Sequence, residues 1–190
     1  MKKILIKSTG ITFRNFYIPP FELFEGEIIV IYLYNGEHVF DLEMHLKNIF
    51  EGKIQNKNVV INQKLSFVEY IRESEFRKIF YPITVKEYLK KHANLNNYYA
   101  DKIYDTDWIN PQTKINRLPG NHRKQLSLYS TLSNSNNIML DVVGQDTRGA
   151  IETFNIIKKE TQNGGSAIIF DNFDDLKNYC CKYIKAQLVK

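Results

Sequence analysis

Residues that could do chemistry gather in one stretch, "RLPGNHRKQLSLYSTLSNSNNIMLDVVGQD", which spans residues 117–146. A short turn at Gly120 leads into a basic and then apolar segment, and a polar gap precedes an apolar run that ends on Asp141. Backbone N–H groups at a helix start can hold phosphate, and a carboxylate can organise a magnesium ion. The stretch indicates either a nucleotide-hydrolysing site with altered reactive residues or an ordinary helix and strand.

Two elements nearer the amino terminus would form the other side of such a site. Residues 26–34, "GEIIVIYLY", form a continuous β-branched and aromatic run, which is typical of a strand covered on both faces. Asn35 and Gly36 interrupt this run. From Val39 onward apolar residues recur at three- and four-residue intervals until Gly52. The pattern predicts a buried strand, a tight turn and an amphipathic helix.

The other segments predict further strands. Alternating apolar runs on either side of Gly10, "ILI" and "ITFRNFYI", predict antiparallel strands near an edge, before the Pro19-Pro20 pair. The runs "NVVI", "LSFVEYI" and "SAIIF" predict additional strands. Buried strands that alternate with amphipathic helices predict an α/β domain with a largely parallel sheet.

Further helices are indicated by their start and stop signals. Thr84 and Glu87 are spaced as a capping box at the start of one helix. A second amphipathic pattern runs from Ala150 to Ile157 and ends at the glycine-rich residues 163–165. The segment "DDLKNYCCKYI" predicts a final helix or a helix followed by a strand, whereas residues 94–116 are polar and aromatic with weak periodicity.

Composition is that of a globular chain, with 43% hydrophobic and 25% charged residues. The net charge of +5 permits binding to nucleic acid or an anionic membrane, but lysine and arginine often stand beside acids, as in "RESEFRK". No run approaches the ~20 apolar residues of a membrane span. The adjacent Cys180 and Cys181 fit neither a paired-cysteine metal site nor a disulfide framework. We therefore expect a cytoplasmic protein.

Taken in order, these segments resemble the nucleotide-binding domain of an ATP-binding-cassette (ABC) ATPase. The matching segments are "FELFEGEIIVIYLYNG", "FYPITVKEYL", "LPGNHRKQLSLYSTL", "NIMLD", "GQD" and "GGSAIIFDNFDDL". The resemblance implies a P-loop NTPase-like (RecA-like) α/β fold in a single domain over residues 1–190. It implies a mostly parallel sheet, an N-terminal antiparallel β part and a small helical subdomain over about residues 84–132.

The phosphate loop departs most from the family pattern. A P-loop needs glycines that expose backbone N–H groups, a lysine for the terminal phosphates and a hydroxyl for magnesium. Here "LYNGEHVFD" keeps only Asn35 and Gly36, and Val39 aligns with the lysine. Phe40 and Asp41 align with the hydroxyl positions. The resemblance therefore implies weak or absent ATP binding, no cofactor, and a vestigial nucleotide contact at Asn35 and Gly36.

The Walker B strand also lacks a residue that the family uses for hydrolysis. Asp141 aligns with the aspartate that organises magnesium, and we expect it to be a vestige of that site or a polar residue at a strand end. Val142 stands where the family has the glutamate that positions water, so the general base is missing. We expect Val39 and Val142 to face each other across a shared, empty pocket.

The signature turn, which in the family holds the phosphate of a partner cassette, is also changed. Pro119, Asn121 and His122 replace the serine, one glycine and the glutamine, while Gly120 remains. Arg123 and Lys124 follow; they either offer positive charge there or belong to a solvated helix start, and we favour the second. The expected partner interface consists of Pro119, Gly120, Asn121 and His122, together with Asp146 of the loop after Walker B.

Two further positions complete the comparison with the family. Asn172 aligns with the H-loop histidine, and the Q-loop glutamine falls near Glu73. The alterations together predict a catalytically inactive subunit that is structural or regulatory. Its expected partners are an active ABC ATPase or an ABC permease, in a homo- or heterodimer, with the membrane reached only through a partner at its inner face.

Other sites and functions remain open from the sequence. The basic surface and the many tyrosines permit a stand-alone nucleic-acid-binding module, which we consider unlikely. A third possibility is an unusual ligand in a cleft lined by Asn35, Gly36 and His38. His38 and His45 are two helical turns apart, but no third metal ligand clusters nearby, so we expect no metal. Trp108 is a candidate partner contact.

Overall fold

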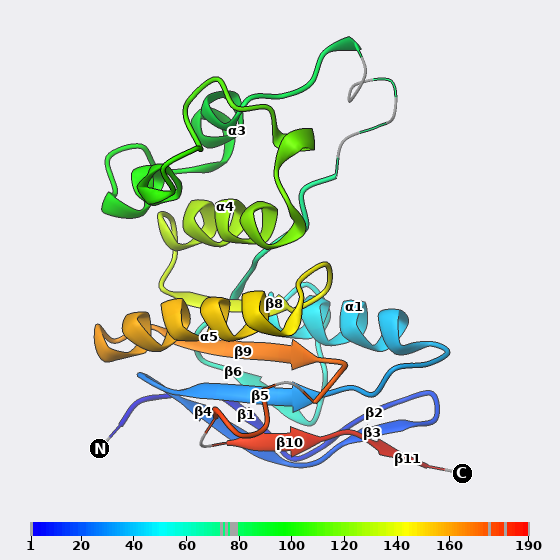
Figure 1. Ribbon diagram of the computed structural model, residues 1–190. Coiled ribbons are helices and arrows are strands. Elements are labelled where there is room, and N and C mark those ends of the chain that lie inside the picture. Colours follow the sequence, from blue (N-terminus) through cyan, green and yellow to red (C-terminus); the bar gives the residue numbers. More distant parts are fainter. Residues whose placement is uncertain are drawn as a thin grey trace.

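The computed structural model describes residues 2–72, 74, 76, 80–174, 176–180 and 182–189 of the 190-residue chain. At its centre is a five-stranded, wholly parallel sheet in the order β10-β5-β9-β8-β7 (Figure 1). Its strands are β5 (Ile28–Tyr32), β7 (Ser66–Phe67), β8 (Asn137–Asp141), β9 (Ser166–Asp171) and β10 (Tyr183–Lys185). The β-branched runs of the sequence thus form the interior strands, β5, β8 and β9.

Alternate residues of these strands enter two different apolar clusters. On one face, Ile29 and Ile31 of β5 pack with helix α1 (Val39–Phe50) and with the amino-terminal strands. On the other face, Val30 packs with helix α5 (Thr147–Gln162) and with the end of α4 (Gly120–Leu132). Because both faces are covered, successive residues in the middle of these strands are apolar, and polar residues stand only at the ends of β8 and β9.

Antiparallel strands from the amino-terminal region form two smaller sheets. The first has the order β4-β1-β6, with β4 (Phe21–Phe24), β1 (Ile4–Ser8) and β6 (Val59–Ile61). The second has the order β11-β3-β2, with β11 (Gln187–Leu188), β3 (Phe16–Ile18) and β2 (Ile11–Phe13). In Figure 1 strands β1 to β4 and β11 lie in the lower part of the molecule, together with β10 and away from α5.

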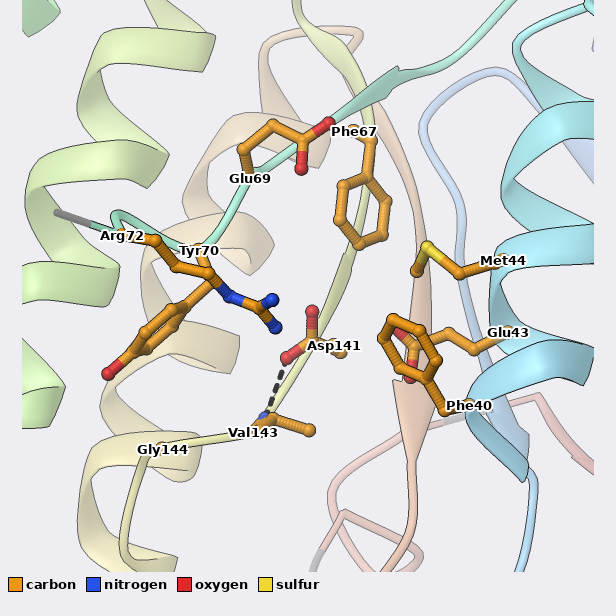
Figure 2. Close-up of a pocket in the computed structure, with 10 residues that line it drawn as sticks. All are labelled: Phe40, Glu43, Met44, Phe67, Glu69, Tyr70, Arg72, Asp141, Val143 and Gly144. Atoms are coloured by element: carbon orange, nitrogen blue, oxygen red, sulfur yellow. Dashed lines mark hydrogen bonds between the residues drawn. The ribbon is translucent and has the colours of Figure 1, made fainter. Parts of the chain in front are cut away.

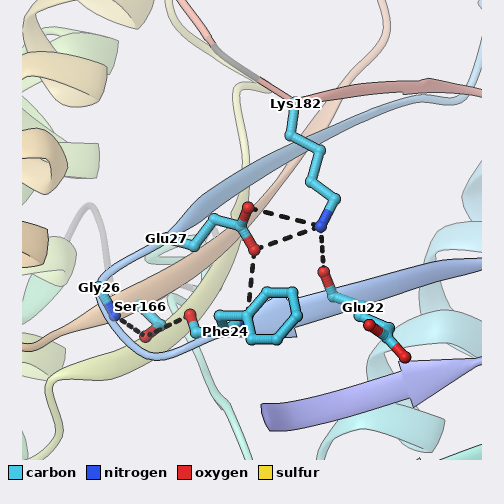
Figure 3. Close-up of polar contacts among 6 residues, drawn as sticks. All are labelled: Glu22, Phe24, Gly26, Glu27, Ser166 and Lys182. Atoms are coloured by element: carbon cyan, nitrogen blue, oxygen red, sulfur yellow. Dashed lines mark hydrogen bonds and ion pairs between the residues drawn. The ribbon is translucent and has the colours of Figure 1, made fainter. Parts of the chain in front are cut away.

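A polar junction ties the antiparallel part to the parallel sheet (Figure 3). Lys182, just before β10, donates to the carbonyl of Glu22 and lies 3.3 Å from the Glu27 carboxylate. The same carboxylate accepts the backbone N–H of Phe24 at 3.0 Å. The hydroxyl of Ser166 accepts from Gly26 N–H and donates to the Phe24 carbonyl. The turn at residues 24–27 is therefore held by Ser166 of β9 and by Lys182, which precedes β10.

A separate helical part stands above the sheet in Figure 1. It contains α3 (Val85–His92), the 3-10 helices η1 (Tyr98–Asp105) and η2 (Ile115–Arg117), and the first half of α4. A third apolar cluster holds it together and includes Val85, Leu89 and Leu126. Since Leu128 and Leu132 of α4 belong to the cluster on the sheet, α4 connects the two parts.

The sequence predicted this architecture correctly in its main lines. The α/β class, the largely parallel sheet and the antiparallel amino-terminal part are confirmed. The predicted capping box is present: Thr84 Oγ1 accepts from Glu87 N–H at 3.1 Å, and Glu87 Oε2 accepts from Thr84 N–H at 2.7 Å. The subdomain limits of 84–132 remain a prediction.

Two predicted segments differ from the structure. Residues 65–71 were expected to form one strand, but only Ser66–Phe67 pair with β8 before the chain turns into the helical part. No helix forms among the described residues of 174–184; turns lead instead to β10, which becomes an edge of the parallel sheet. Asp175 and Cys181 lie outside the described residues. No described helix is long and apolar enough to cross a membrane.

Candidate functional site

A cleft of about 480 Å³ opens beside the ends of β7 and β8 (Figure 2). Its lining is mainly apolar and aromatic, with three carboxylates and one guanidinium. The lining residues are Phe40, Glu43, Met44, Phe67, Glu69, Tyr70, Arg72, Asp141, Val143 and Gly144. The cleft therefore lies where side chains from α1, β7 and the end of β8 converge, and we take it as the candidate site.

Asp141 forms the floor of this cleft at the last residue of β8. One of its oxygens, Oδ1, accepts the backbone N–H of Val143 at 2.8 Å. The same oxygen lies 3.2 Å from Nζ of Lys124, whose side chain is entirely out of reach of solvent. Lys124 makes no other polar contact with a described residue, and its geometry toward Asp141 is that of an ion pair.

Glu43 of α1 is the second acidic group at the floor. Its residue is buried, and burial raises its pKa to about 8, with the negative charge of Asp141 adding to the rise. The cations of Lys124 and Lys47 act in the opposite direction. At neutral pH Glu43 is therefore an uncharged acid beside the Asp141–Lys124 pair.

The burial of Lys124 corrects the expectation of a solvated helix start. Lys124 is 1% exposed, and burial lowers the pKa of its ammonium while the nearby Asp141 acts to raise it. Arg123 is also held in place, since its guanidinium donates to the carbonyls of Ile115 and Asn116 at 3.1 and 2.8 Å. Neither side chain belongs to a freely solvated surface.

The loop that aligns with the phosphate loop lies outside the lining of the cleft. Asn35, Gly36 and His38 are exposed and do not line it. Arg14, from the β2–β3 turn, contacts both His38 Nδ1 and Asp41 Oδ2 at 2.5 Å. The guanidinium of Arg14 therefore holds this loop against the β2–β3 turn. His38 adopts a left-handed backbone conformation with φ 64°.

Val39 and Val142 do not face each other across the cleft, so this expectation is wrong. Val39 packs into the apolar cluster of α1 and the antiparallel strands, whereas Val142 packs into the cluster of α5 on the other face. The alternation of side chains along a strand explains the position of Val142: because Asp141 points into the cleft, the next residue points away from it. Phe40 and Val143, their exposed neighbours, line the cleft instead.

The signature turn packs closely against the loop after β8. Pro119 is the N-cap of α4, and a side chain at Gly120 would meet the carbonyl oxygen of Gly144 at 2.0 Å. Asn121 Nδ2 donates to Asp146 Oδ1 at 3.1 Å, and the same oxygen accepts the N–H of Gly149 at 2.7 Å. Both hydrogen bonds lower the pKa of Asp146, and the bond from the Gly149 N–H has the larger effect.

Trp108 joins this group through His122. Their ring centroids are 5.1 Å apart with an interplanar angle of 67°, an edge contact. The structure therefore connects the six residues of the expected interface by contacts, from Trp108 through His122, Pro119, Gly120 and Asn121 to Asp146.

The remaining predicted positions have structural roles or lie outside the described residues. Asp171, at the end of β9, accepts N–H groups from Phe173 and Leu176, both at 3.0 Å, and so shapes the loop that contains Asn172. Glu73 lies outside the described residues. His45 stacks on Phe13 at 4.4 Å, and burial lowers its pKa. No group of three or more metal-binding side chains occurs in the described part of the chain.

Sequence reasoning did not single out Glu43, and it assigned Lys124 to a solvated helix start. The signal for Glu43 was present, because it shares the helical stripe of Val39, Leu42 and Leu46, which faces the core. The signal for Lys124 was weaker. Leu126 of α4 packs into the core of the helical part, whereas Leu128 and Leu132 pack into the cluster on the sheet. Lys124 lies just before the part of α4 that reaches the sheet.

Comparison with solved structures identifies what this fold is similar to. One is an inward-facing metal-chelate type ABC transporter, with 14% identity, 98% of this chain and 84% of that chain covered, and a TM-score of 0.68. Another is cbiO1 from Clostridium perfringens, part of the ABC transporter complex cbiONQ (14%, 98% and 86%, 0.66). A third is an ABC transporter ATP-binding protein from Pyrococcus furiosus (17%, 95% and 96%, 0.67).

No family model matches the sequence, and no curated protein matches it. The chain nevertheless has the fold of ABC ATP-binding cassettes over nearly its whole length, which confirms the expected P-loop NTPase-like fold. At such low identity the likeness is one of fold alone. What the cleft can do must therefore be argued from its own residues.

Proposed function

We propose that this chain is a non-hydrolysing ABC-cassette-like subunit with a structural or regulatory role. It pairs with an active ATPase or docks on a permease, and it reaches the inner face of the membrane through that partner. The proposal is supported by the cassette fold and by the chemistry of the cleft, which differs from what a triphosphate and magnesium require.

The observation that carries the proposal is the buried ion pair of Lys124 and Asp141. A magnesium ion needs carboxylate oxygens that are free to coordinate it. Here Oδ1 of Asp141 already accepts the Val143 N–H and faces the Lys124 ammonium. A divalent cation at this position would have to displace or adjoin a positive charge that has no exit to solvent, so binding is disfavoured.

The phosphate side of the cleft is equally unfavourable. Val39, which aligns with the family's lysine, is buried in the apolar core and does not reach the cleft. Phe40 supplies an aromatic ring to the lining at a hydroxyl position. Glu43, Glu69 and Asp141 give the lining three carboxyl groups. Lys124 and Lys47 are already paired with Asp141 and Glu69, so the guanidinium of Arg72 is the one cation among the described residues of the lining. A triphosphate would therefore meet acids and aromatic rings instead of cations and backbone N–H groups.

The mouth of the cleft suits contact with another protein. Phe40 is 60% exposed and Val143 is 47% exposed, and the two lie on opposite sides of the cleft in Figure 2. Large apolar side chains exposed together around a hollow are typical of an interaction surface. We propose that this surface, with the signature turn, is covered in the assembled complex.

The catalytic part of the proposal is tested with purified protein. We expect no magnesium-dependent ATP turnover, and ATP binding by calorimetry no tighter than millimolar, whereas a hydrolysing cassette assayed alongside shows both. Micromolar binding of magnesium-ATP to this chain would contradict the proposal. The Lys124→Gln variant asks whether the ion pair is the cause, because it removes the competing cation while keeping a side chain of similar length.

The partner role needs a separate experiment. Tagged protein is recovered from detergent-solubilised membranes, and co-purified ABC ATPase or permease subunits are identified by mass spectrometry. The double variant Phe40→Glu/Val143→Glu should lose the partner. The matched control is Val60→Glu, an equally exposed apolar position on β6. Retention of the partner by the double variant would show that the mouth of the cleft is not the contact surface.

A further inference from the structure

A second hollow, of about 360 Å³, lies on the helical part and shares no lining residue with the cleft. It is lined by Trp108, Asn110, Gln112, Thr113, Lys114 and Arg117. We infer that this hollow is a binding site for a nucleotide unit, either free or within a single strand. The base stacks on Trp108 and the phosphate lies against Lys114 and Arg117. This inference does not rest on the function proposed above.

The indole of Trp108 is presented as a fixed platform. It is 49% exposed, and it is the single tryptophan of the chain. The ring of His122 contacts it edge-on at 5.1 Å, and the next residue, Ile109, is buried in the core of the helical part. A large ring that is held from one side and open on another can stack a base at little cost in side-chain entropy.

Two cations without acidic partners stand beside this ring. Neither Lys114 nor Arg117 forms an ion pair with any described residue, whereas nearby Lys102 pairs with Asp105 at 2.7 Å. No carboxylate is among the lining residues. The hollow therefore presents uncompensated positive charge, which favours an anionic group in the ligand.

The loop between the ring and the cations is held by hydrogen bonds and leaves the side-chain amide of Gln112 available. Asn110 Oδ1 accepts from Gln112 N–H, and Thr113 Oγ1 accepts from Asn110 N–H, both at 2.9 Å. The carbonyl of Thr113 accepts from Val85 N–H at 2.9 Å, which fixes the loop to α3. The side-chain amide of Gln112 forms no hydrogen bond within the described structure, so it is free to meet the edge of a base.

The combination selects among ligand classes. A carbohydrate would use the ring and the amides but leave both cations idle, and an acidic peptide would use the cations but not the stacking face. A nucleotide uses all three groups: a π-face, hydrogen-bonding edges and a phosphate. A protein partner that covers Trp108 is the competing occupant, and the experiment below separates the two.

The test uses the fluorescence of Trp108, the one indole of the chain, excited at the long-wavelength edge of the indole band where the 12 tyrosines do not absorb. The probes are uridine monophosphate and single-stranded octauridylate. We expect saturable quenching by at least one probe, and the comparison of the two identifies a free nucleotide or a strand as the source. Absence of saturable quenching by both probes overturns the inference. Equal quenching by oligoglutamate also overturns it, because the site would then accept any polyanion.

Matched variants test the named contacts. Lys114→Gln/Arg117→Gln should weaken binding about tenfold or more, and Lys158→Gln/Lys159→Gln, which removes the same charge from α5, should change it less than about twofold. With labelled octauridylate and anisotropy, Trp108→Ala should weaken binding about tenfold and Trp108→Phe much less, because phenylalanine keeps a stacking face. Equal losses in the two double variants would overturn the site.

Discussion

The ammonium of Lys124 lies 3.2 Å from Oδ1 of Asp141, and the two side chains are 0% and 7% exposed. The pair joins α4, which carries the signature turn, to the last residue of β8. Asp141 therefore receives its counter-charge from within the chain. This arrangement explains how the floor of the cleft keeps a buried carboxylate.

The first prediction concerns the stability that depends on this pair. Lys124→Met keeps an unbranched chain of similar length but leaves Asp141 buried without a cation. We expect a loss of about 3 kcal/mol in the free energy of unfolding, measured by urea denaturation. Lys124→Met/Asp141→Asn should recover more than half of that loss, because asparagine removes the charge and can still accept the Val143 N–H.

Arg148→Met is the control for this experiment. Arg148 also pairs with a carboxylate, Glu152 at 3.1 Å, but its side chain is 89% exposed. We expect no measurable change, since solvent screens such pairs. If Lys124→Met proves as stable as the parent protein, the buried pair is not what balances Asp141.

The second prediction follows from Glu43, whose pKa is raised from 4.5 to about 8. Between these values the unfolded chain releases the proton of Glu43 while the folded chain keeps it. The contribution of Glu43 to the free energy of unfolding therefore falls as pH rises from 4.5 to 8. Glu43→Gln removes this loss, so its stability relative to the parent should increase across the window, by on the order of 3 kcal/mol.

The difference between the two proteins is the quantity to measure, by urea denaturation at pH 5 and pH 8. The charges of Asp141, Lys124 and Lys47 act on Glu43, and all three residues are present in both proteins. A difference that stays constant with pH would mean that Glu43 is ionised in the fold, as it is in the unfolded chain.

The fold could be predicted from the sequence because its main strands carry a strong local signal. In β5, β8 and β9 nearly every residue is apolar, and this pattern has few alternatives to a strand covered on both faces. The turn after β7 carried no such signal. Residues 68–71 are as apolar as a strand, and only the packing of Ile71 into the helical part separates them from β7.

The candidate site was less accessible to sequence reasoning, for a physical reason. Alignment with a family pattern locates backbone positions, but side-chain direction decides which residues line a cleft. Of the aligned positions, Phe40 and Asp141 line the cleft whereas Val39 and Val142 do not, and Glu43 lines it although it matches no motif. Lys124 illustrates the same limit, because its burial depends on α4 packing against the sheet, 17 residues before Asp141 in the sequence.

The third prediction tests the close approach of the signature turn to the loop after β8. A Cβ at Gly120 would lie 2.0 Å from the carbonyl oxygen of Gly144. Helix propensity favours alanine by about 1 kcal/mol, but a backbone carbonyl cannot move aside as a side chain can. We expect Gly120→Ala to lose about 2 kcal/mol in the free energy of unfolding.

Gly36→Ala is the matched control, because nothing lies within 4 Å of a Cβ there. It should be neutral or slightly stabilising in the same thermal or urea unfolding assay. Equal stability of the two alanine variants would mean that the turn and the loop move apart readily, and the interface residues would then not be held in one arrangement.

The fourth prediction concerns the anchor of the helical part. Thr84 begins α3, its hydroxyl accepts from Glu87 N–H, and the residue bridges to Lys114 across the loop that carries the second hollow. Thr84→Val keeps the side-chain volume but removes the acceptor, so the loss should be about 1 kcal/mol in urea denaturation. Thr84→Ser keeps the acceptor and should lose less than half of that. If serine proves as damaging as valine, packing of the threonine methyl, and not the cap, fixes the start of α3.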